Sequence, residues 1–475
     1  MKKCLVIGGG FAGLSASAYL VNSGFDVELI EASPKLGGRA YSFLHKETNT
    51  IIDNGQHIMM GCYDDTMSFL AMIGVLDKVQ VQQEVQVKVQ EKLNVNFLKP
   101  GFELHQLRAS SLPYPFNLQS AIINYSAITF RERLSILRFF LKLPFLAQRD
   151  LLKMTVDELL TKENQNENVR KAFWEVICVG ALNTNLKNAS AKIFVDILKE
   201  IFLKGSSGSK IILPRSSLSE MYCEPARQFI EGKGGRISLS ERVEEIKADR
   251  GKAVEVISNN RSITDFDIVI CAVPHYALEN IINLAFLNNH SEINSESKAN
   301  HLYEEQMLKQ SALGGLHDRS RPNIQSFSPQ YSSILNVHVW LTEAKKGNRF
   351  NEDFYALIDS KLHWVFIHDS HLTCVISDAD YLMNLSDEEI MNMICSELEK
   401  YLSIKKNVIQ NYFFIKEKRA TFIPSNKILN NRPNIETGIK NLFLAGDWVN
   451  TGLPSTIESA VRSGRLAAEF IVSGL

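Results

Sequence analysis

Three glycines and one glutamate near the start of the chain have the types and spacing needed to bind a dinucleotide. Gly8, Gly10 and Gly13 form a Gly-x-Gly-x-x-Gly pattern, in which the glycines permit a tight turn, close approach to a pyrophosphate and close helix packing, in that order. Glu31 follows roughly twenty residues later, where a carboxylate can accept hydrogen bonds from both ribose hydroxyls. The sequence therefore predicts a nucleotide site, whose further contact residues are Phe11, Ala12 and Ala32.

The elements that would position these residues follow one another in the required order. Residues 4–7 are an apolar run typical of a buried parallel strand, residues 12–21 predict a helix closed by Gly24, and residues 25–30 predict a second strand. The start of such a helix presents free N–H groups and a partial positive charge to the phosphates. The glycine pattern alone also fits an ordinary turn, but this order of elements favours a Rossmann-like unit.

A second glycine pair follows the acidic residue. Gly37, Gly38 and Arg39 predict a loop folded over the pyrophosphate, with Arg39 in bidentate contact with a phosphate group. The alternative is a surface turn with a solvated arginine.

The far end of the chain offers a second group of ligands. Residues 441–445 predict a strand that ends at Gly446 and Asp447, and Pro454 is expected to open a helix running from Ser455 to about residue 471. Asp447 can bind a ribityl hydroxyl. The N-terminus of the helix can face the flavin N1–C2=O edge, where negative charge develops on reduction, through residues Ser455, Thr456 and Ile457.

Together these motifs resemble the family of flavin amine oxidases and phytoene desaturases. Within it, residues 53–57 (DNGQH) and 445–458 are most similar to the hydroxysqualene dehydroxylases, also described as squalene-associated FAD-dependent desaturases; residues 363–366 and 419–422 fit them too. The resemblance covers nearly the whole chain. It implies bound FAD, an α/β fold with a discontinuous Rossmann-like FAD-binding domain, and an α+β substrate domain. No Cys or His lies beside the strand that ends at Gly446 and Asp447 as a tether, so we expect the FAD to be bound non-covalently. The expected FAD contacts also include Gly55 and Val243.

The resemblance implies reductive dehydroxylation of hydroxysqualene to squalene, within squalene and hopanoid isoprenoid synthesis. Loss of the hydroxyl leaves an allylic cation, which takes hydride from N5 of reduced flavin. Hydroxide leaves poorly, so a general acid is needed. His57 is the first candidate for that acid, and Gln56 would hold the leaving oxygen; alternatively, His57 only shapes the pocket or contacts FAD.

Three other functions remain open. A carotenoid or phytoene desaturase would use FAD as an oxidant, and a non-catalytic FAD-bearing partner of a squalene-forming complex would bind FAD without turnover. An amine oxidase would cage its amine between two aromatic rings, but only Trp448 can be placed. The glycines at 232–235 follow a helix and precede a strand, the wrong order for a second nucleotide site, so the electron donor stays unidentified.

The expected FAD-binding domain comprises residues 1–80, 206–274 and 416–475. Residues 81–205 and 275–415 are expected to form the substrate domain, with an inserted polar, mobile loop at about 285–328.

Composition excludes several other classes of function. The 475 residues carry a formal net charge of -1, which gives no argument for a nucleic-acid partner. The seven cysteines show no C-x-x-C pair and no zinc-ligand spacing, so we expect free thiols, no metal and a reducing compartment. The apolar run after Met1 is interrupted at Gly8, which argues against a signal peptide, and we expect a cytoplasmic protein.

Residues 129–152 combine basic and apolar side chains, as a helix lying in a bilayer interface would. We expect from this segment either a peripheral contact with the inner face of the cytoplasmic membrane or a helix packed on the substrate domain. Replacement of Phe139 and Phe140 by Ser would release the protein from liposomes on the first interpretation. The resemblance also implies squalene-synthase-like enzymes as pathway partners.

Overall fold

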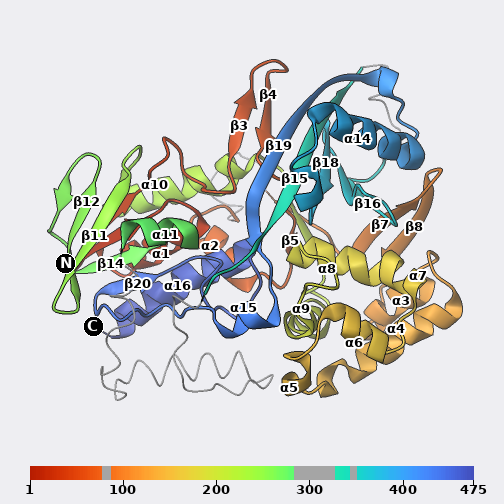
Figure 1. The fold of residues 1–475 in the computed structure, drawn as a ribbon, viewed down its shortest axis with the longest axis horizontal. Coiled ribbons are helices and arrows are strands. Elements are labelled where there is room, and N and C mark those ends of the chain that lie inside the picture. Colours follow the sequence, from red (N-terminus) through yellow and green to blue (C-terminus); the bar gives the residue numbers. More distant parts are fainter. Residues whose placement is uncertain (77–86, 283–326, 343–349, 475) are drawn as a thin grey trace.

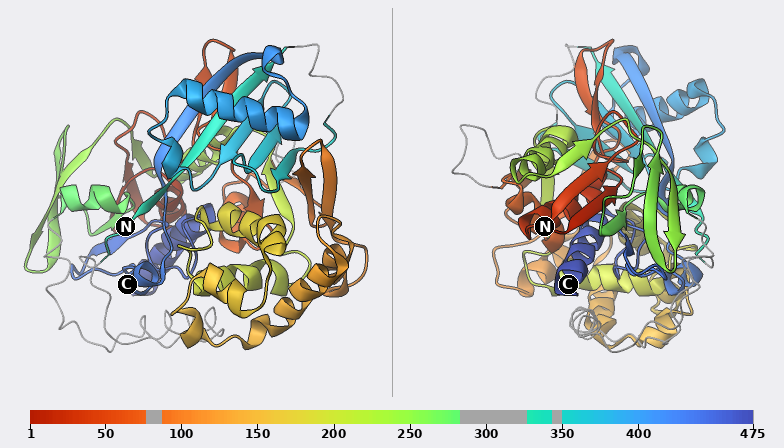
Figure 2. Two further views of the ribbon diagram at one scale, coloured as in Figure 1. Left: turned by 45° about the vertical axis from the view of Figure 1, so that its right-hand side comes forward. Right: turned by 90° about the vertical axis from the view of Figure 1, so that its left-hand side faces the viewer.

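The computed structural model describes residues 1–76, 87–282, 327–342 and 350–474. A parallel sheet with its helices forms one part of the molecule, and a larger sheet with a group of helices below it forms the other (Figure 1). Both chain termini lie in the first part (Figures 1 and 2). Strands of the first part come from the beginning, middle and end of the chain, which confirms an α/β fold with a discontinuous Rossmann-like domain.

The first part is built on five parallel strands in the order β10-β2-β1-β14-β20. Their side chains are mostly buried, as expected where helices cover both faces of a parallel sheet. The strands have the bounds β1 (Lys3–Ile7), β2 (Asp26–Ile30), β10 (Arg236–Ser238), β14 (Ile268–Cys271) and β20 (Leu442–Leu444), and β1, β2 and β20 confirm the strands predicted at 4–7, 25–30 and 441–445.

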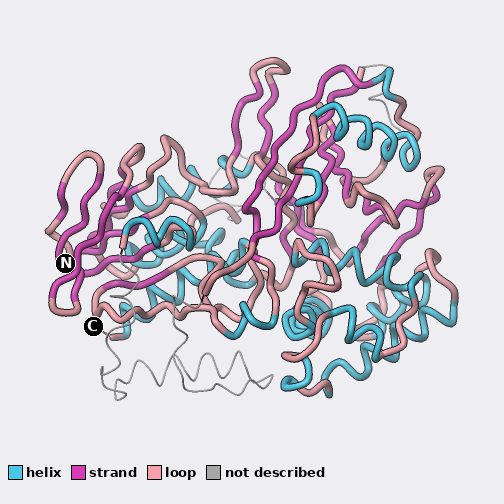
Figure 3. The backbone as a smooth tube through the Cα atoms, in the orientation of Figure 1, coloured by secondary structure: helices cyan, strands magenta, loops and turns pink. Residues whose placement is uncertain are grey.

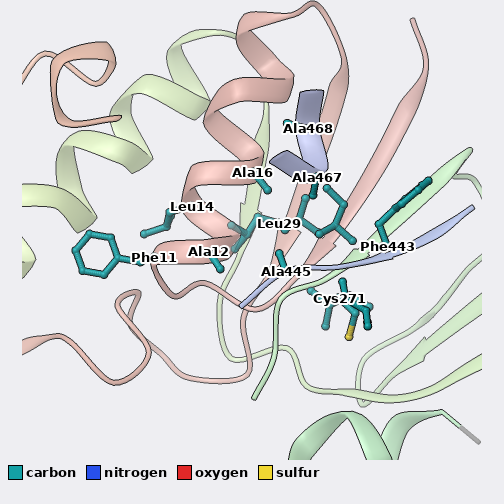
Figure 4. Packing of buried hydrophobic residues seen from close by; sticks show 14 of the residues in the cluster. Phe11, Ala12, Leu14, Ala16, Leu29, Cys271, Phe443, Ala445, Ala467 and Ala468 are labelled. Atoms are coloured by element: carbon teal, nitrogen blue, oxygen red, sulfur yellow. The ribbon is translucent and has the colours of Figure 1, made fainter. Parts of the chain in front are cut away.

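Two helices from opposite ends of the chain pack against each other on this sheet. They are α1 (Phe11–Asn22) and α16 (Ile457–Ser473), whose small residues Ala12, Ala16, Ala467 and Ala468 lie over Leu29, Cys271 and Phe443 (Figure 4). Gly464 makes this contact close, because a Cβ there would collide with the Ala12 carbonyl oxygen and come within 2.8 Å of the Ala16 nitrogen. The contact brings the two predicted groups of ligands together.

Smaller elements complete this part. A side sheet packs beside α11, and π-helix η3 leads into α10. The bounds are α2 (Asp64–Met72), η3 (Ser219–Cys223), α10 (Glu224–Gly232), β11 (Val243–Asp249), β12 (Lys252–Ser258), β13 (Ser262–Ile263), α11 (His275–Ile281) and α15 (Asn426–Asn430).

The second part is built on a seven-stranded sheet in the order β19-β15-β18-β17-β16-β7-β8. All of its pairs are antiparallel except the pair of β16 with β7. Helix α14 (Asp387–Leu402) covers one face (Figure 2). The strands are β7 (Asn94–Lys99), β8 (Glu103–Arg108), β15 (Tyr331–Leu341), β16 (Phe354–Leu357), β17 (Trp364–Ile367), β18 (Leu372–Ile376) and β19 (Ile409–Phe422), with 3-10 turns η6 (Asp380–Leu382) and η7 (Lys406–Val408).

A group of helices lies below this sheet in the view of Figure 3. It contains α3 (Phe116–Asn124), α4 (Phe130–Lys142), η1 (Leu143–Phe145), α5 (Gln148–Leu151), α6 (Val156–Lys162), α7 (Glu167–Val169), η2 (Arg170–Trp174), α8 (Glu175–Leu182) and α9 (Ala191–Leu203). Two short sheets join the parts: the hairpin of β3 (Ser42–His45) with β4 (Thr50–Asp53), and the sheet of β5 (Met59–Met60), β9 (Ile211–Pro214) and β6 (Val87–Val89).

Packing departs from the predicted domain limits at two places. Strand β19 crosses the limit at residue 416, because it pairs with β15 as far as Phe422. Helix α11 was assigned to the substrate domain, but its Leu278 and Ile281 belong to the core of the nucleotide-binding part. The inserted loop expected at about 285–328 lies outside the described residues, apart from 327 and 328.

The segment at 129–152 forms α4, η1 and α5. Choosing Phe139 as a membrane contact was wrong: its side chain is 1% exposed and its ring lies 4.9 Å from that of Trp174 in the helical core. Phe140 is half-buried against the Phe202 ring, with centroids 5.2 Å apart. Among the described residues, no helix has the length and apolarity needed to cross a membrane.

Candidate functional site

One cavity of about 1010 Å³ extends from the glycine-rich turn into the second part of the molecule. It has three zones, which we call the nucleotide end, the junction and the apolar end. The predicted cofactor-binding residues other than Gly13 all line it: Gly8, Gly10, Phe11, Ala12, Glu31, Ala32, Gly37, Gly38, Arg39, Gly55, Val243, Gly446, Asp447, Pro454, Ser455, Thr456 and Ile457.

The nucleotide end is formed by closely spaced backbone. The carboxylate of Glu31 accepts from the Gly9 N–H at 2.6 Å and from the Ser33 N–H at 2.7 Å, so the acid is fixed at the end of β2. Gly13 does not line the cavity, because it lies where α1 crosses the turn; a Cβ there would collide with the Gly8 carbonyl oxygen.

The space at Gly10 tests whether this end fits a dinucleotide. A Cβ on Gly10 would meet nothing closer than the Gly38 Cα atom at 3.9 Å, so the protein alone does not require glycine there. A pyrophosphate lying against the turn would require it. The open cradle, the fixed Glu31 carboxylate and the start of α1 together fit FAD.

Arg39 lines the cavity and uses two of its donors within the protein. Its guanidinium donates to the Asp447 carboxylate at 2.5 Å and to the Ala420 carbonyl oxygen at 2.6 Å. The other Asp447 carboxylate oxygen accepts from the Ser455 hydroxyl. Arg39 therefore links the glycine-rich loop to the C-terminal loop, and a phosphate contact would have to use its remaining donors.

The C-terminal helix starts later than predicted. Helix α16 begins at Ile457, and Thr456 is its N-cap, whose hydroxyl accepts from the Ser459 N–H at 3.2 Å. Pro454 and Ser455 therefore lie in the preceding loop. The prediction placed the proline at the first helical position, whereas the structure uses the general preference for Thr as an N-cap.

Sequence reasoning missed Arg432, which organises this loop from behind. Its side chain is 1% exposed and donates to the carbonyl oxygens of Trp448, Leu453, Asp447 and Val449. Burial lowers its pKa to about 10, so the guanidinium stays charged at neutral pH. A lone arginine before a proline carries no recognisable signal in the sequence.

Glu458 also belongs to the cavity wall, although only its motif was noticed in the sequence. Its carboxylate accepts from the backbone N–H groups of Asp65 and Thr66 at 3.0 and 2.8 Å and thus caps α2, whose own N-cap residue makes no side-chain bond. Burial, with Asp65 beside it, raises the pKa of Glu458 to about 7. Glu458 therefore connects α2 to α16 in the wall of the cavity.

The junction is lined by the strand end that carries the DNGQH motif and by β15. Gln56 and His57, the predicted catalytic pair, both line the cavity here, facing it with Asn54 and Asn336. Asp53 is structural: it accepts from the Ser42 hydroxyl at 2.6 Å and the Leu218 N–H at 3.1 Å.

One ring nitrogen of His57 is hydrogen-bonded, and the other has no partner among the described residues. Its Nδ1 lies 2.7 Å from the Gly55 carbonyl oxygen, which assigns the proton of a neutral ring to Nδ1. Among the described residues, Nε2 has no hydrogen-bond partner. Desolvation lowers the pKa of His57, although Asp53 acts in the opposite direction. The ring is therefore neutral at pH 7 and has a free acceptor.

Two asparagines at the junction carry amide oxygens without partners among the described residues. Asn336 is 2% exposed and Asn54 is 5% exposed, and the Oδ1 atom of each is unbonded. The Asn336 amide donates to the Asn54 carbonyl oxygen at 3.4 Å. Buried acceptors of this kind cost free energy unless a ligand satisfies them, so they indicate a polar ligand group at the junction.

The apolar end passes between the large sheet and the helices. Trp364 packs here over Gly180, where a Cβ would lie 3.1 Å from the indole ring. Most of the remaining wall is aliphatic or aromatic, with Glu200 among its polar members, and comes from strands and helices far apart in the chain: Leu93, Val95, Phe97, Leu107, Val176, Ile177, Ile197, Ile201, Phe202, Ile211, Ile334, Phe354, Phe366 and Val375. Such a wall suits a long hydrocarbon chain.

Three further aromatic or basic residues of the motifs make contacts within the protein. The Trp448 indole donates to the Val273 carbonyl oxygen at 3.0 Å and packs against Phe327, and the residue also lines the cavity. His363 accepts from the Ser377 N–H, and Arg419 stacks over Tyr276.

The sequence profile of one family, described as flavin containing amine oxidoreductase, matches residues 11–472. Hydroxysqualene dehydroxylase of Zymomonas mobilis is 24% identical over 98% of both chains, and that of Sinorhizobium fredii is 25% identical over 99% of both. A 15-cis-phytoene desaturase of an Oncidium hybrid is 25% identical over 98% of this chain and 77% of its own length.

Solved structures share the fold at lower identity. An oxidoreductase of Methanosarcina mazei superposes with a TM-score of 0.63 at 15% identity, covering 97% of this chain and 98% of its own. An engineered putrescine oxidase superposes with a TM-score of 0.65 at 15% identity, covering 99% of this chain and 98% of its own.

Proposed function

The chain belongs to the flavin containing amine oxidoreductase family and is an FAD-dependent oxidoreductase, and from this premise we propose that it reduces hydroxysqualene to squalene. The observation that carries the proposal is the cavity itself. One continuous space joins a dinucleotide cradle, a small polar junction and a long apolar wall. A hydrocarbon of isoprenoid type with one hydroxyl group matches this sequence of zones.

The reaction removes the hydroxyl as water, with one proton, and replaces it by hydride at the same carbon. Bound reduced FAD supplies the hydride. The apolar end excludes water from the carbon that becomes electron-deficient, and it holds the chain so that only the oxygen-bearing carbon reaches the junction.

Residues of the junction handle the leaving oxygen. One of the free oxygens of Asn54 and Asn336 accepts from the substrate hydroxyl and orients it, both accept once the oxygen leaves as water with two hydrogens, and Gln56 lies beside them. His57 transfers the proton through Nε2 while the Gly55 carbonyl oxygen holds Nδ1–H. The ring takes up this proton from solvent before the substrate closes the cavity, and because burial lowers the pKa of His57, the protonated ring loses it readily to the leaving oxygen.

Phytoene desaturation is the second candidate, because relatives of that name match over nearly the whole chain. Its substrate class would use the same apolar wall and the opposite redox direction. The unsatisfied polar atoms at the junction favour the hydroxylated substrate, since a pure hydrocarbon would leave them unpaired. A non-catalytic FAD-bearing partner of a squalene-forming complex would bind the same cofactor without turnover.

Location and partners complete the proposal. We place the protein in the cytoplasm, at the inner face of the cytoplasmic membrane, where its isoprenoid substrate dissolves and where a squalene-synthase-like enzyme would supply it. The electron donor is a separate reductant of unassigned identity.

The test is an anaerobic assay on the purified holoprotein, with its flavin reduced chemically. Addition of hydroxysqualene should restore the absorbance of oxidised flavin and yield squalene in equal amount. Flavin that stays reduced would reject this substrate, and desaturation of phytoene by the oxidised protein would establish the alternative.

A further inference from the structure

The surface around α3 and α4 exposes large apolar side chains at the end of the molecule away from both termini (Figure 1). Phe145 is 85% exposed, Leu141 68%, Phe130 61% and Phe116 56%. We call this surface the α3–α4 face; its exposed apolar members are Leu112, Tyr114, Phe116, Ile123, Phe130, Leu134, Leu141 and Phe145. They lie on and beside elements that contact one another, α3 with α4 and α4 with η1, and exposed apolar side chains gathered in this way mark a candidate binding surface.

Helix α4 has two apolar faces. Phe130, Leu134 and Leu141 lie within about 40° of one another around a helix of 3.6 residues per turn, and all three are exposed. The buried residues Ile136 and Phe139 lie roughly opposite, in the helical core. One face therefore holds the helix on the protein, and the other remains without a partner among the described residues.

Cationic side chains flank the exposed stripe. Around α4, Arg131 and Arg138 lie beside the stripe, about 60–80° from its middle, and Arg149 lies in α5; all three are exposed and make no ion pair with any described residue. Lys142 is 55% exposed and pairs with Glu163 at 2.6 Å, and the carboxylate of Glu132 is used to cap α4. An apolar stripe with unpaired arginines beside it complements an anionic lipid surface.

The α3–α4 face adjoins the apolar end of the cavity. Phe202, a cavity residue, packs its ring against Phe140 on α4 at 5.2 Å. Its carbonyl oxygen accepts from the Tyr114 hydroxyl at 3.2 Å, and the next residue, Leu203, is 38% exposed. Residues of the face are thus direct neighbours of residues that line the cavity.

We propose that the α3–α4 face docks on a bilayer containing anionic lipid, and that isoprenoid substrate passes between the bilayer and the cavity beside Phe202. The docking step stands on the exposed face alone, whereas the identity of the lipid that enters rests on the proposed function. Phe116, Leu141 and Phe145 enter the acyl region, and the arginines contact phosphate groups.

The chain offers a matched control on another surface. Leu44 and Ile51 are cross-strand neighbours on the β3–β4 hairpin, and each is 51% exposed. The pair L141S/F145S removes two exposed apolar side chains from the α3–α4 face, and L44S/I51S removes two from the hairpin. Neither pair lines the cavity, so both variants should bind FAD and melt like the parent protein.

Sedimentation with vesicles of phosphatidylcholine, with and without phosphatidylglycerol, tests the docking. We expect L141S/F145S to weaken binding to the anionic vesicles at least about tenfold, and L44S/I51S to leave it unchanged. R131Q/R138Q should weaken binding only where phosphatidylglycerol is present. Equal binding by parent and L141S/F145S, or loss in L44S/I51S instead, would overturn the proposal, as would self-association through this face in the absence of lipid.

A second measurement separates docking from chemistry. L141S/F145S should turn over hydroxysqualene dispersed in detergent at the parent rate, but should slow on substrate embedded in vesicles. An unchanged rate on embedded substrate would reject the entry route. No turnover by the parent protein under either condition would reject the proposed function and leave the vesicle-binding result standing.

Discussion

The two ends of the cavity are built from different materials. The nucleotide end consists of backbone and fixed charge: glycines in close contact, a Glu31 carboxylate held by two N–H groups, and Arg39 bonded to Asp447. The apolar end consists of side chains from distant elements, with only a few polar atoms where it meets the junction.

This difference separates binding from choice of reaction. The closely spaced backbone of the nucleotide end binds one cofactor tightly. The apolar wall, in contrast, accepts any chain of suitable length. Selectivity for one reaction must then come from the junction, where His57, Asn54 and Asn336 present unsatisfied acceptors. Changes at the three zones should therefore have different signatures.

The largest effect is expected from Gly13→Ala compared with Gly10→Ala. A Cβ on residue 13 collides with the Gly8 carbonyl oxygen, so G13A should yield little folded protein. A Cβ on residue 10 meets only open space, so G10A should melt as the parent apoprotein does yet bind FAD about 100-fold more weakly. Flavin fluorescence titration with thermal melting of both apoproteins checks this. Normal FAD affinity in G10A would mean that the pyrophosphate does not lie against the glycine-rich turn.

His57→Ala is expected to keep FAD bound and to slow turnover by about 10²–10⁴-fold. Its side chain faces the junction and makes only one hydrogen bond, to Gly55, so folding should not change. Single-turnover reoxidation of the reduced flavin measures the step. Full activity in H57A would assign proton transfer to another group.

Asn336→Leu should lower kcat about tenfold or more while FAD affinity stays constant, because the substrate hydroxyl loses an acceptor of similar size and position. Asn336→Asp, which keeps an acceptor, should lose less. Steady-state assays with both variants check the order. If N336L instead released FAD, the free amide oxygen would belong to the cofactor site.

A smaller effect on stability is expected from three histidines on the large sheet. Burial lowers the pKa of His338 and His368 to about 4 and that of His371 to about 2. The unfolded chain binds protons near pH 6.5 and the folded chain does not, so stability is full above pH 6.5 and falls as pH drops toward 4. Each histidine contributes about 1.3 kcal/mol between these two pH values, so urea unfolding at pH 7.5 and 5.5 should differ by about 4 kcal/mol, and H371Q should reduce the difference by about a third. No change with pH would mean that the histidines are already protonated when folded.

Sequence reasoning succeeded where signals are local. The turn at Gly8 to Gly13, the strand ending at Glu31 and the strand ending at Asp447 each combine a short apolar run with residues of special backbone geometry. These segments confirm the cofactor-binding half of the fold.

Prediction failed where the outcome depends on which face of an element meets the core. Helix α4 is apolar on two sides, so the pattern alone could not show that Phe139 is buried while Leu141 is exposed. Asn336 lies in a strand whose neighbours are set by long-range pairing, and Arg432 bonds only to carbonyl oxygens. The start of α16 at Ile457 could have been predicted from the sequence, because Thr456 is a good N-cap.

If the proposed reaction is right, hydride passes to the carbon that loses its hydroxyl group. A single turnover of the reduced holoprotein with hydroxysqualene in D₂O follows this hydrogen, because the N5 hydrogen of reduced flavin exchanges with solvent. We expect oxidised flavin and squalene that carries one deuterium at the former oxygen-bearing carbon. Squalene without deuterium, or flavin that remains reduced beside unchanged hydroxysqualene, would contradict it.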